Sequence, residues 1–309
     1  MQDVDTSPIA LVDALHAACG RRPGVRATHA RGVCALGEFR PAPGVGSFIA
    51  SPMFALRAVP ATVRFSVAGG DPDASEKSRS TRGLALRLEA AGERYDLVLL
   101  SEPVFFAATL ESFVGFLHAH LPDPATGQAD PARIAAHEAV FPEGARQSAL
   151  LAGHAAPASY ATTPYFSNNA FLFTGGAGRV QPARIVVQPE AGTHYLSDAQ
   201  AADLPDSFLE AELDERLHRG PIAFLFTALL PSAGDSLTDP SAAWTGAGSV
   251  TLGRLLVQAL TSGDCEGLGF VPTNLPPAVA PTQDPILLAR KAAYAVSERR
   301  RTLTRSMRG

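Results

Sequence analysis

Cysteine is scarce in this chain of 309 residues. Its three cysteines, Cys19, Cys34 and Cys265, are odd in number, widely spaced and without a CxxC pair, so we expect neither a disulfide framework nor a thiolate zinc site. This usage fits a reducing compartment. The N-terminus has acidic residues where a secretory leader has basic ones and lacks a sustained apolar run, which predicts no export signal. We therefore expect a cytoplasmic protein.

The sequence has no long block of basic residues and only a small net charge. The 26 basic and 30 acidic residues give a net charge of −4, and no block of Lys or Arg is long enough to follow a phosphate backbone. Nucleic acid is therefore not an expected partner. The most apolar stretch, residues 222–230, is about half of what crosses a bilayer, so no membrane partner is expected either.

Common nucleotide-binding and hydrolase motifs are also missing. The sequence has no GxxxxGK[ST], HExxH or GxSxG, and the glycines at 175, 176 and 178 fit a hairpin turn between two strands. The eight histidines are scattered along the chain. They give little support to a metal site made of protein ligands alone or to a hydrolase triad.

What the sequence does contain is a generous apolar interior, with 46% hydrophobic and 18% charged residues. Helical spacing occurs in residues 5–20, 108–120, 130–155 and 197–218. Short, often alternating runs predict strands between residues 25 and 100 and again at 171–174, 184–190, 222–230 and 248–260. This mixture predicts an α+β fold on an antiparallel sheet or barrel.

We expect one domain over residues 1–309. An N-terminal helix and loop take residues 1–24, the barrel and its helices 25–270, and a Pro-rich segment with a final helix 271–301. The final helix is predicted to begin at Asp284-Pro285, because an acid at the N-cap followed by proline is a typical helix start.

This final helix carries a polar stripe. At about 100° per residue, Arg290, Tyr294, Ser297 and Arg301 share one face. For the helix alone, a solvated face is the simpler interpretation. The alternative is that Arg290, one turn before Tyr294, favours its phenolate, which is a hard anionic ligand for ferric iron.

Five segments carry a more specific pattern. They are RATHARGVCALGEF (26–39), VRFSVAGGDPDASEKSRSTRGLALRLE (63–89), YDLVLLSEPVFFAATLESFVGFLHA (95–119), NNAFLFTGGAGR (168–179) and RKAAYAVSERR (290–300). In this order they resemble the haem catalases, specifically the short catalase-related peroxidases. The resemblance implies a catalase-like antiparallel β-barrel with surrounding helices, without the C-terminal helical and flavodoxin-like domains of large catalases, and a haem b cofactor.

The resemblance also implies roles for individual residues. Tyr294 takes the place of the iron ligand and Arg290 that of its partner, since tyrosine holds the haem iron of catalases. His29 takes the place of the residue that moves a proton between the two peroxide oxygens, and Ser66 that of the hydroxyl that orients it.

Five further residues are implied to contact the haem. Arg26, Arg64 and Arg301 would bind the propionates, Phe113 would stack on the porphyrin edge, and Phe105 would line the distal side. Arg64 and Ser66 are two apart in an alternating strand and so point to the same face. The alternatives are a surface salt bridge for Arg64 and an ordinary core position for Phe113 or Phe105.

One departure from the family bears on the reaction. The distal asparagine of long catalases falls on Leu100 or, if the alignment shifts by one residue, on Ser101. Leucine offers no hydrogen bond, so a second peroxide would be held poorly in a drier pocket. We therefore expect weak dioxygen release and better activity with small aromatic donors.

The expected function is a haem-dependent peroxidase that reduces H2O2 or an organic peroxide and oxidises a small organic donor, with weak catalase activity. Two alternatives stay open. One is a specialised haem enzyme acting on a hydroperoxide or a secondary metabolite, and the other is a non-catalytic haem-binding protein. A homodimer also stays open as the assembly.

Overall fold

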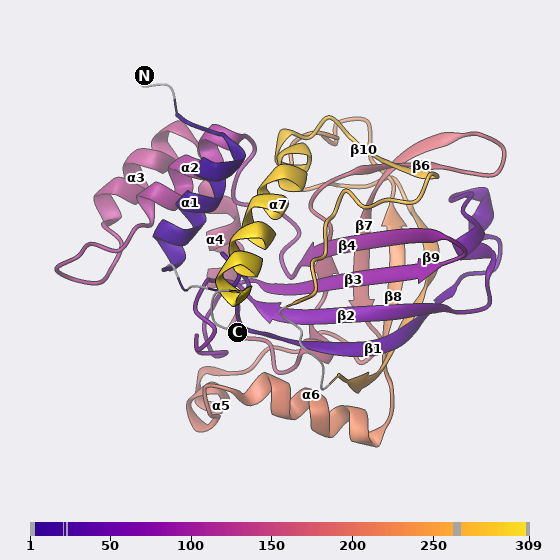
Figure 1. Ribbon diagram of the computed structural model, residues 1–309, viewed down its shortest axis with the longest axis horizontal. Helices are drawn as coiled ribbons and strands as arrows, with labels where there is room; N and C mark the ends of the chain where they lie inside the picture. Colours follow the sequence, from indigo (N-terminus) through magenta and orange to yellow (C-terminus); the bar gives the residue numbers. More distant parts are fainter. Residues whose placement is uncertain (1–3, 21, 23, 262–266, 307–309) are drawn as a thin grey trace.

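A closed antiparallel barrel forms the centre of the computed structural model, which describes residues 4–20, 22, 24–261 and 267–306 (Figure 1). The barrel strands are β1 (Gly32–Pro41), β2 (Val59–Val67), β3 (Arg82–Ala90), β4 (Glu93–Leu100), β5 (Tyr165–Phe166), β7 (Val180–Pro189), β8 (Ile222–Leu229) and β9 (Ser249–Leu260). Their order is β7-β5-β4-β3-β2-β1-β9-β8, and β8 pairs back with β7. β6 (Phe171–Thr174) and β10 (Val279–Pro281) extend the sheet beyond β7. The predicted α+β fold on an antiparallel barrel is confirmed.

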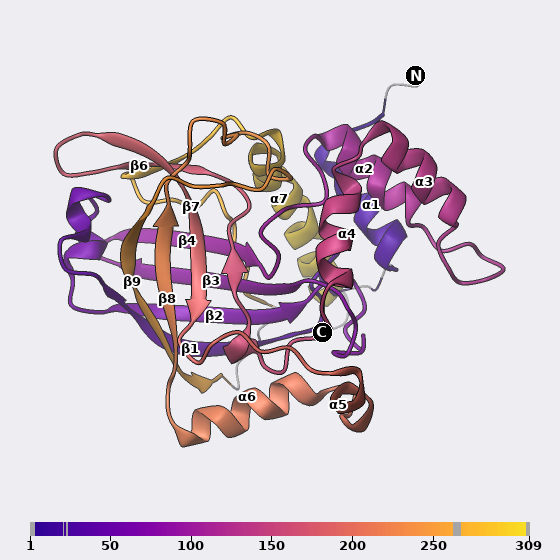
Figure 2. The same ribbon diagram turned by 180° about the vertical axis from the view of Figure 1, so that it is seen from behind.

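Seven helices surround this barrel in the described part of the chain. They are α1 (Pro8–Cys19), α2 (Leu110–Ala119), α3 (Pro131–Val140), α4 (Gly144–Ala152), α5 (Asp198–Asp203), α6 (Phe208–Arg219) and α7 (Pro285–Ser306). Three 3-10 turns, Val45–Ser47, Pro52–Ala55 and Tyr160–Thr162, complete the regular structure. Figure 2 shows β7, β8 and β9 closing the barrel on the side away from α7, with α6 along one end.

Two hydrophobic cores hold these elements together. The main core fills the barrel, and α6 contributes Leu209, Leu213 and Leu217 to it. A second, smaller core joins α1 and α2 through Leu11, Ala14, Val114 and Leu117, and Ala289 and Ala293 of α7 pack against it. This second core packs α7 against α1, and in Figure 1 α7 stands at one end of the strands β1 to β4.

Alternation along β2 separates two faces of the barrel wall. Val63, Phe65 and Val67 belong to the main core. Because side chains alternate along a strand, the intervening Arg64 and Ser66 point together to the outer face. The sequence predicted that these two residues share one face.

The strand register aligns the outer-face residues into three rows across β2, β3 and β4. Ser66, Gly83 and Leu100 form the first row, Arg64, Ala85 and Val98 the second, and Thr62, Arg87 and Asp96 the third. The rows place residues from three separate sequence segments side by side on the barrel wall that faces α7.

Several helix boundaries differ from the prediction. Residues 130–155 form α3 and α4 with a break at residues 141–143, and residues 197–218 are divided between α5 and α6. Pro142 and Pro205 lie in these breaks, and proline cannot continue a helix without loss of a backbone hydrogen bond. The final helix begins after Asp284 as predicted, but it continues to Ser306. Asp284 Oδ1 accepts the N–H groups of residues 286 and 287 at 2.9 and 3.2 Å and so caps the helix.

The expectation of unpaired cysteines is wrong for Cys34. This residue of β1 is disulfide-bonded, whereas Cys19 at the end of α1 is free. Cys265 lies outside the described residues. The expectation of a reducing compartment rested on the absence of disulfides, and it loses that support. None of the described helices has the length and apolar composition needed to span a membrane.

Candidate functional site

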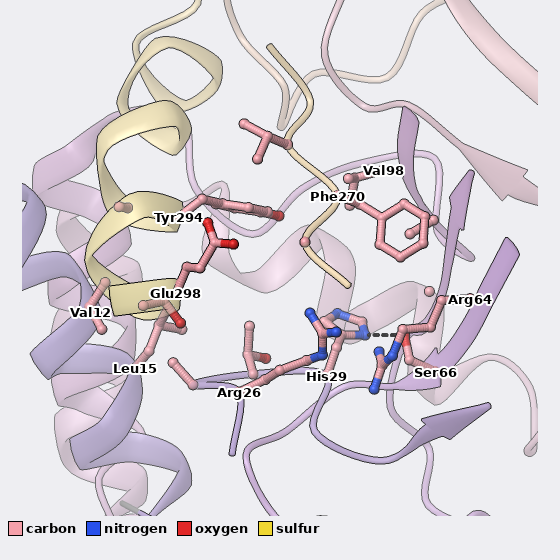
Figure 3. Close-up of a pocket in the computed structure, with 18 of the residues that line it drawn as sticks. Val12, Leu15, Arg26, His29, Arg64, Ser66, Val98, Phe270, Tyr294 and Glu298 are labelled. Atoms are coloured by element: carbon pink, nitrogen blue, oxygen red, sulfur yellow. Dashed lines mark hydrogen bonds between the residues drawn. The ribbon is translucent and has the colours of Figure 1, made fainter. Parts of the chain in front are cut away.

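A cavity lies between the outer face of β2 to β4 and the helix α7 (Figure 3). Six of the nine candidate residues from the sequence line it, namely Arg26, His29, Arg64, Ser66, Tyr294 and Arg301. The side chain of Tyr294 enters from α7, and His29 and Ser66 approach from the barrel side. Residues from distant parts of the sequence therefore meet in one place.

His29 is held in an uncommon backbone conformation. Its φ is 53°, in the left-handed region that residues with a side chain rarely adopt. The backbone N–H of Ala30 donates to Gly69 O at 2.9 Å and anchors the loop that carries it. The imidazole Nδ1 lies 3.0 Å from Ser66 Oγ. This contact orients the ring and leaves Nε2 for a ligand in the cavity.

The pKa of His29 is lowered to about 3. The largest cause is burial, which disfavours the charged imidazolium. The positive charges of four arginines act in the same direction: Arg64, Arg290, Arg82 and Arg26. His29 is therefore neutral near pH 7 and able to accept a proton.

Gly83 leaves the space that His29 and Ser66 occupy. A Cβ atom at position 83 would lie 2.5 Å from Ser66 Oγ and 2.9 Å from His29 Nδ1. Gly83 carries no local sequence signal for this role, because its position opposite Ser66 follows from the pairing of β2 with β3.

A chain of hydrogen bonds supports Tyr294 from the other side. Arg290 Nη2 donates to the phenol oxygen at 2.8 Å, and Nη1 donates to Asn169 Oδ1 at 3.1 Å. Asn169 Nδ2 donates in turn to Asp284 Oδ2 at 2.6 Å. Burial raises the pKa of Asp284, against the lowering effect of the hydrogen bonds from Asn169 and from the N–H groups of residues 286 and 287. The guanidinium of Arg290 is thus held between Asn169 and Tyr294.

Asn169 was missed by the sequence analysis as a functional residue. It is buried in the segment between β5 and β6, 121 residues before Arg290. The asparagine pair that begins NNAFLFTGGAGR was the available signal, but nothing local connects it to the final helix.

Three arginines bring positive charge to the cavity. Arg64 is buried, and its Nη2 donates to Ala30 O at 3.1 Å. Arg26 Nη2 donates to Leu268 O at 2.5 Å, and Arg301 is buried on α7. Guanidinium groups are well suited to the two carboxylates of a haem.

Phe105 and Phe113 are not among the described residues that line the cavity. Their rings stack with centroids 6.3 Å apart, and Phe106 lies 4.3 Å from Phe105 and 5.4 Å from Phe113. Phe113 also packs against the second core. A haem contact for Phe105 or Phe113 stays a prediction.

The structure distinguishes Leu100 from Ser101. Leu100 lines the cavity in the same row as Ser66 and Gly83. Ser101 Oγ instead accepts the N–H of Arg82 at 2.9 Å and donates to Glu102 Oε1 at 3.2 Å. The cavity position in this row is therefore occupied by an apolar side chain.

The residues around this cavity fit a haem. Tyr294 offers a phenol oxygen paired with a cation, which is a suitable ligand for ferric iron. Among the other polar groups of the cavity are the neutral imidazole of His29 and the guanidinium groups of the arginines, which suit the propionates. By contrast, the described residues contain no group of three or more His, Cys, Asp or Glu that could hold a metal ion without a cofactor.

Sequence comparisons identify relatives over nearly the whole chain. The catalase family model matches residues 7–221. Proteins named catalase-related peroxidase from Synechococcus elongatus and Mycolicibacterium paratuberculosis are 34% and 31% identical to this chain. Both alignments cover 96% of this chain, and they cover 89% and 95% of the respective relatives.

Solved structures share the fold at lower identity. Catalase A from Saccharomyces cerevisiae superposes with a TM-score of 0.82 at 21% identity over 94% of this chain, and a bacterial catalase with 0.80 at 22% over 95%. The chain spans 64% and 60% of the length of these two catalases. The barrel, the cavity between β2 to β4 and α7, and these matches lead to one conclusion: the chain belongs to the catalase family of haem-containing oxidoreductases.

Proposed function

We propose that this protein is a haem b peroxidase that reduces H2O2 or an organic peroxide, oxidises a small organic donor and releases little dioxygen. The observation that carries the proposal is one cavity lined both by Tyr294, bonded to Arg290, and by His29, bonded to Ser66. When bound there, the haem supplies the iron that exchanges electrons with the peroxide.

Residues of α7 and the arginines would bind the cofactor. Tyr294 would ligate the iron through its phenol oxygen, and Arg290 would favour the phenolate form. Asn169 keeps the guanidinium of Arg290 in this position. Arg26, Arg64 and Arg301 would hold the propionates.

His29 would move the proton during peroxide cleavage. Because its imidazole is neutral, it can accept a proton from one peroxide oxygen and return it to the other. Ser66 would keep the ring aligned during both transfers. Nε2 is the atom that carries the proton, since Nδ1 is engaged by Ser66.

Leu100 supports a peroxidase rather than an efficient catalase. Catalase turnover requires a second H2O2 to be bound and oxidised, and the leucine that lines the same cavity as His29 gives it no hydrogen bond. The apolar wall favours an organic donor or peroxide. The two relatives named catalase-related peroxidase agree with this choice.

Spectra of the purified protein with and without peroxide test the proposal. We expect a Soret band that reacts with H2O2, dye oxidation, and little oxygen at an electrode. Tyr294→Phe should weaken or abolish haem uptake. A protein that binds no haem would refute the proposal, and a Soret band with no reaction towards any peroxide would favour a non-catalytic haem-binding protein. Turnover confined to one class of hydroperoxide would favour a specialised enzyme.

A further inference from the structure

A short segment before β10 forms one wall of the cavity. Within residues 268–271, which we call the strap, Gly269, Phe270 and Val271 line the cavity. Phe270 is buried, and like Val98 of β4 it lines the cavity (Figure 3). The carbonyl of Leu268 accepts the 2.5 Å hydrogen bond from Arg26 Nη2. The strap therefore contributes both an apolar surface and the support for a cavity arginine.

A buried carboxylate on β4 binds this strap. Asp96 is fully buried, and its Oδ2 accepts the backbone N–H of Val271 at 3.0 Å and Asn274 Nδ2 at 2.8 Å. The N–H of Asp96 donates to Asn274 O at 2.9 Å. Three hydrogen bonds thus connect one residue of the barrel to the strap and the residues that follow it.

Two arginines complete the attachment. Arg87 Nε donates to Asp96 Oδ1 at 2.8 Å, and Arg94 Nη2 donates to Asp96 Oδ2 at 2.9 Å. Both guanidinium groups also donate to Gly269 O, Arg94 at 3.3 Å. Arg87 lies 5.1 Å from the centroid of the Phe270 ring, which adds a cation–π contact. The two cations therefore bridge Asp96 and the strap.

The register explains why this attachment affects the cavity. Arg87 and Asp96 form the row next to Ala85 and Val98, which line the cavity. Asp96 itself is not among the described lining residues. Burial alone would raise the pKa of Asp96, but hydrogen bonds from the arginines, Val271 and Asn274 lower it overall. The carboxylate stays ionised at neutral pH and keeps all of these bonds.

We propose that Asp96 is a positioning residue of the haem site. It acts through Arg87, Arg94 and the strap, so that Phe270 stays against the cavity and the Leu268 carbonyl stays in place for Arg26. Retention of the haem then depends on a side chain that does not line the cavity. This inference rests on the proposed haem site, whereas the hydrogen bonds that it uses exist in the protein without haem.

The test compares two Asp→Asn variants. Asp96→Asn removes the charge that holds the strap. Asp235→Asn is the matched control, because Asp235 also accepts several backbone N–H groups, from Ser232, Thr245 and Gly246, but in the loop between β8 and β9. Haem loss from the ferric protein to excess apomyoglobin is measured, together with hydrogen exchange at the Val271 amide in the haem-free protein.

We expect Asp96→Asn to lose haem about tenfold faster than the wild type, the effect of weakening charge-assisted hydrogen bonds. Its Val271 amide should exchange faster, and its ferric spectrum should be unchanged because Tyr294 and Arg290 lie on α7. Asp235→Asn should retain haem like the wild type. Asn274→Ala, which keeps the charges, should show a smaller change in the same direction and replaces Asp96→Asn if that variant does not fold.

Two results would overturn the inference. One is that Asp96→Asn loses haem and exchanges its Val271 amide at the same rates as the wild type. If Asn274→Ala is used in its place, the same result in that variant overturns the inference. The other is equal acceleration of haem loss in the Asp96 and Asp235 variants, which would indicate general destabilisation. Failure of the wild type to bind haem would contradict the proposed function instead, and amide exchange in the haem-free protein would still decide whether Asp96 holds the strap.

Discussion

Arg290 donates a 2.8 Å hydrogen bond from Nη2 to the phenol oxygen of Tyr294, one helical turn further along α7. The spacing of the two residues makes this contact possible in any helix. Asn169 fixes the orientation of the guanidinium, because its Oδ1 accepts a hydrogen bond from Arg290 Nη1 at 3.1 Å. The same amide donates to Asp284, which caps the helix. One buried asparagine thus connects the start of α7 with the expected iron ligand.

Removal of this connection should weaken haem binding. We expect Tyr294→Phe to reduce haem affinity most, Arg290→Ala less, and Asn169→Ala by about tenfold, because the partly buried guanidinium of Arg290 and the buried carboxylate of Asp284 lose a shared partner. Absorbance titration of the haem-free protein with haem measures the three affinities. Lys291→Ala, on an exposed position of α7, is the control. Wild-type affinity in Asn169→Ala would show that Asn169 does not support the ligand.

Loss of the imidazole should affect peroxide cleavage more than haem binding. We expect His29→Ala to keep haem and to cleave peroxide on the order of 10²–10⁴ times more slowly, the usual contribution of a positioned acid–base group. Ser66→Ala should slow cleavage less, because it removes only the orienting contact. Stopped-flow mixing with H2O2 measures both rates. A His29→Ala protein that reacts at the wild-type rate would exclude the assigned role.

The low pKa of His29 predicts a pH dependence of stability in the haem-free protein. Its pKa is about 3 in the fold and 6.5 in an ordinary setting, so between these values the unfolded state binds more protons. The free energy of unfolding should therefore fall as the pH decreases from about 6.5 towards 3. Urea denaturation at several pH values should show a shallower decrease for His29→Ala than for the wild type. Identical decreases in the two proteins would contradict the low pKa.

Gly83→Ala should disturb the contact between His29 and Ser66. The added methyl group would meet Ser66 Oγ at 2.5 Å, so one of the two side chains must move. We expect haem uptake to persist and peroxide cleavage to slow by on the order of 10², as for a misplaced catalytic group. Gly234→Ala is the control, because no atom lies within 4 Å of the added Cβ there. Equal cleavage rates in both variants would show that the ring tolerates the methyl group.

Leu100→Asn should increase dioxygen release relative to dye oxidation, because an amide near His29 can hold a second H2O2. An oxygen electrode and a dye assay on the same preparation give the ratio of dioxygen release to dye oxidation. We expect this ratio to rise about tenfold, which corresponds to the free energy of one added hydrogen bond. Ser101→Ala should lower stability without changing this ratio, since its hydroxyl bonds to Arg82 and Glu102. Wild-type dioxygen release comparable to that of a large catalase would refute the argument from Leu100.

Local patterns in the sequence were sufficient for several features of the site. Alternation predicted that Arg64 and Ser66 share one face of β2, and helical spacing predicted that Arg290 and Tyr294 share a face of α7. Asp284 was recognised as the start of that helix. These features depend on residues only a few positions apart, so periodicity and capping are enough to derive them.

The remaining features depend on contacts between distant segments. Gly83 reaches His29 only through the register of β2 with β3, Asn169 meets Arg290 across 121 residues, and Asp96 meets Val271 across 175. Sequence periodicity determines which face a side chain occupies, whereas strand register and helix packing determine what it meets there. That is why helical spacing and the family resemblance identified Tyr294, and the resemblance alone identified His29, while only the tertiary structure identified Asn169 and Gly83 beside them.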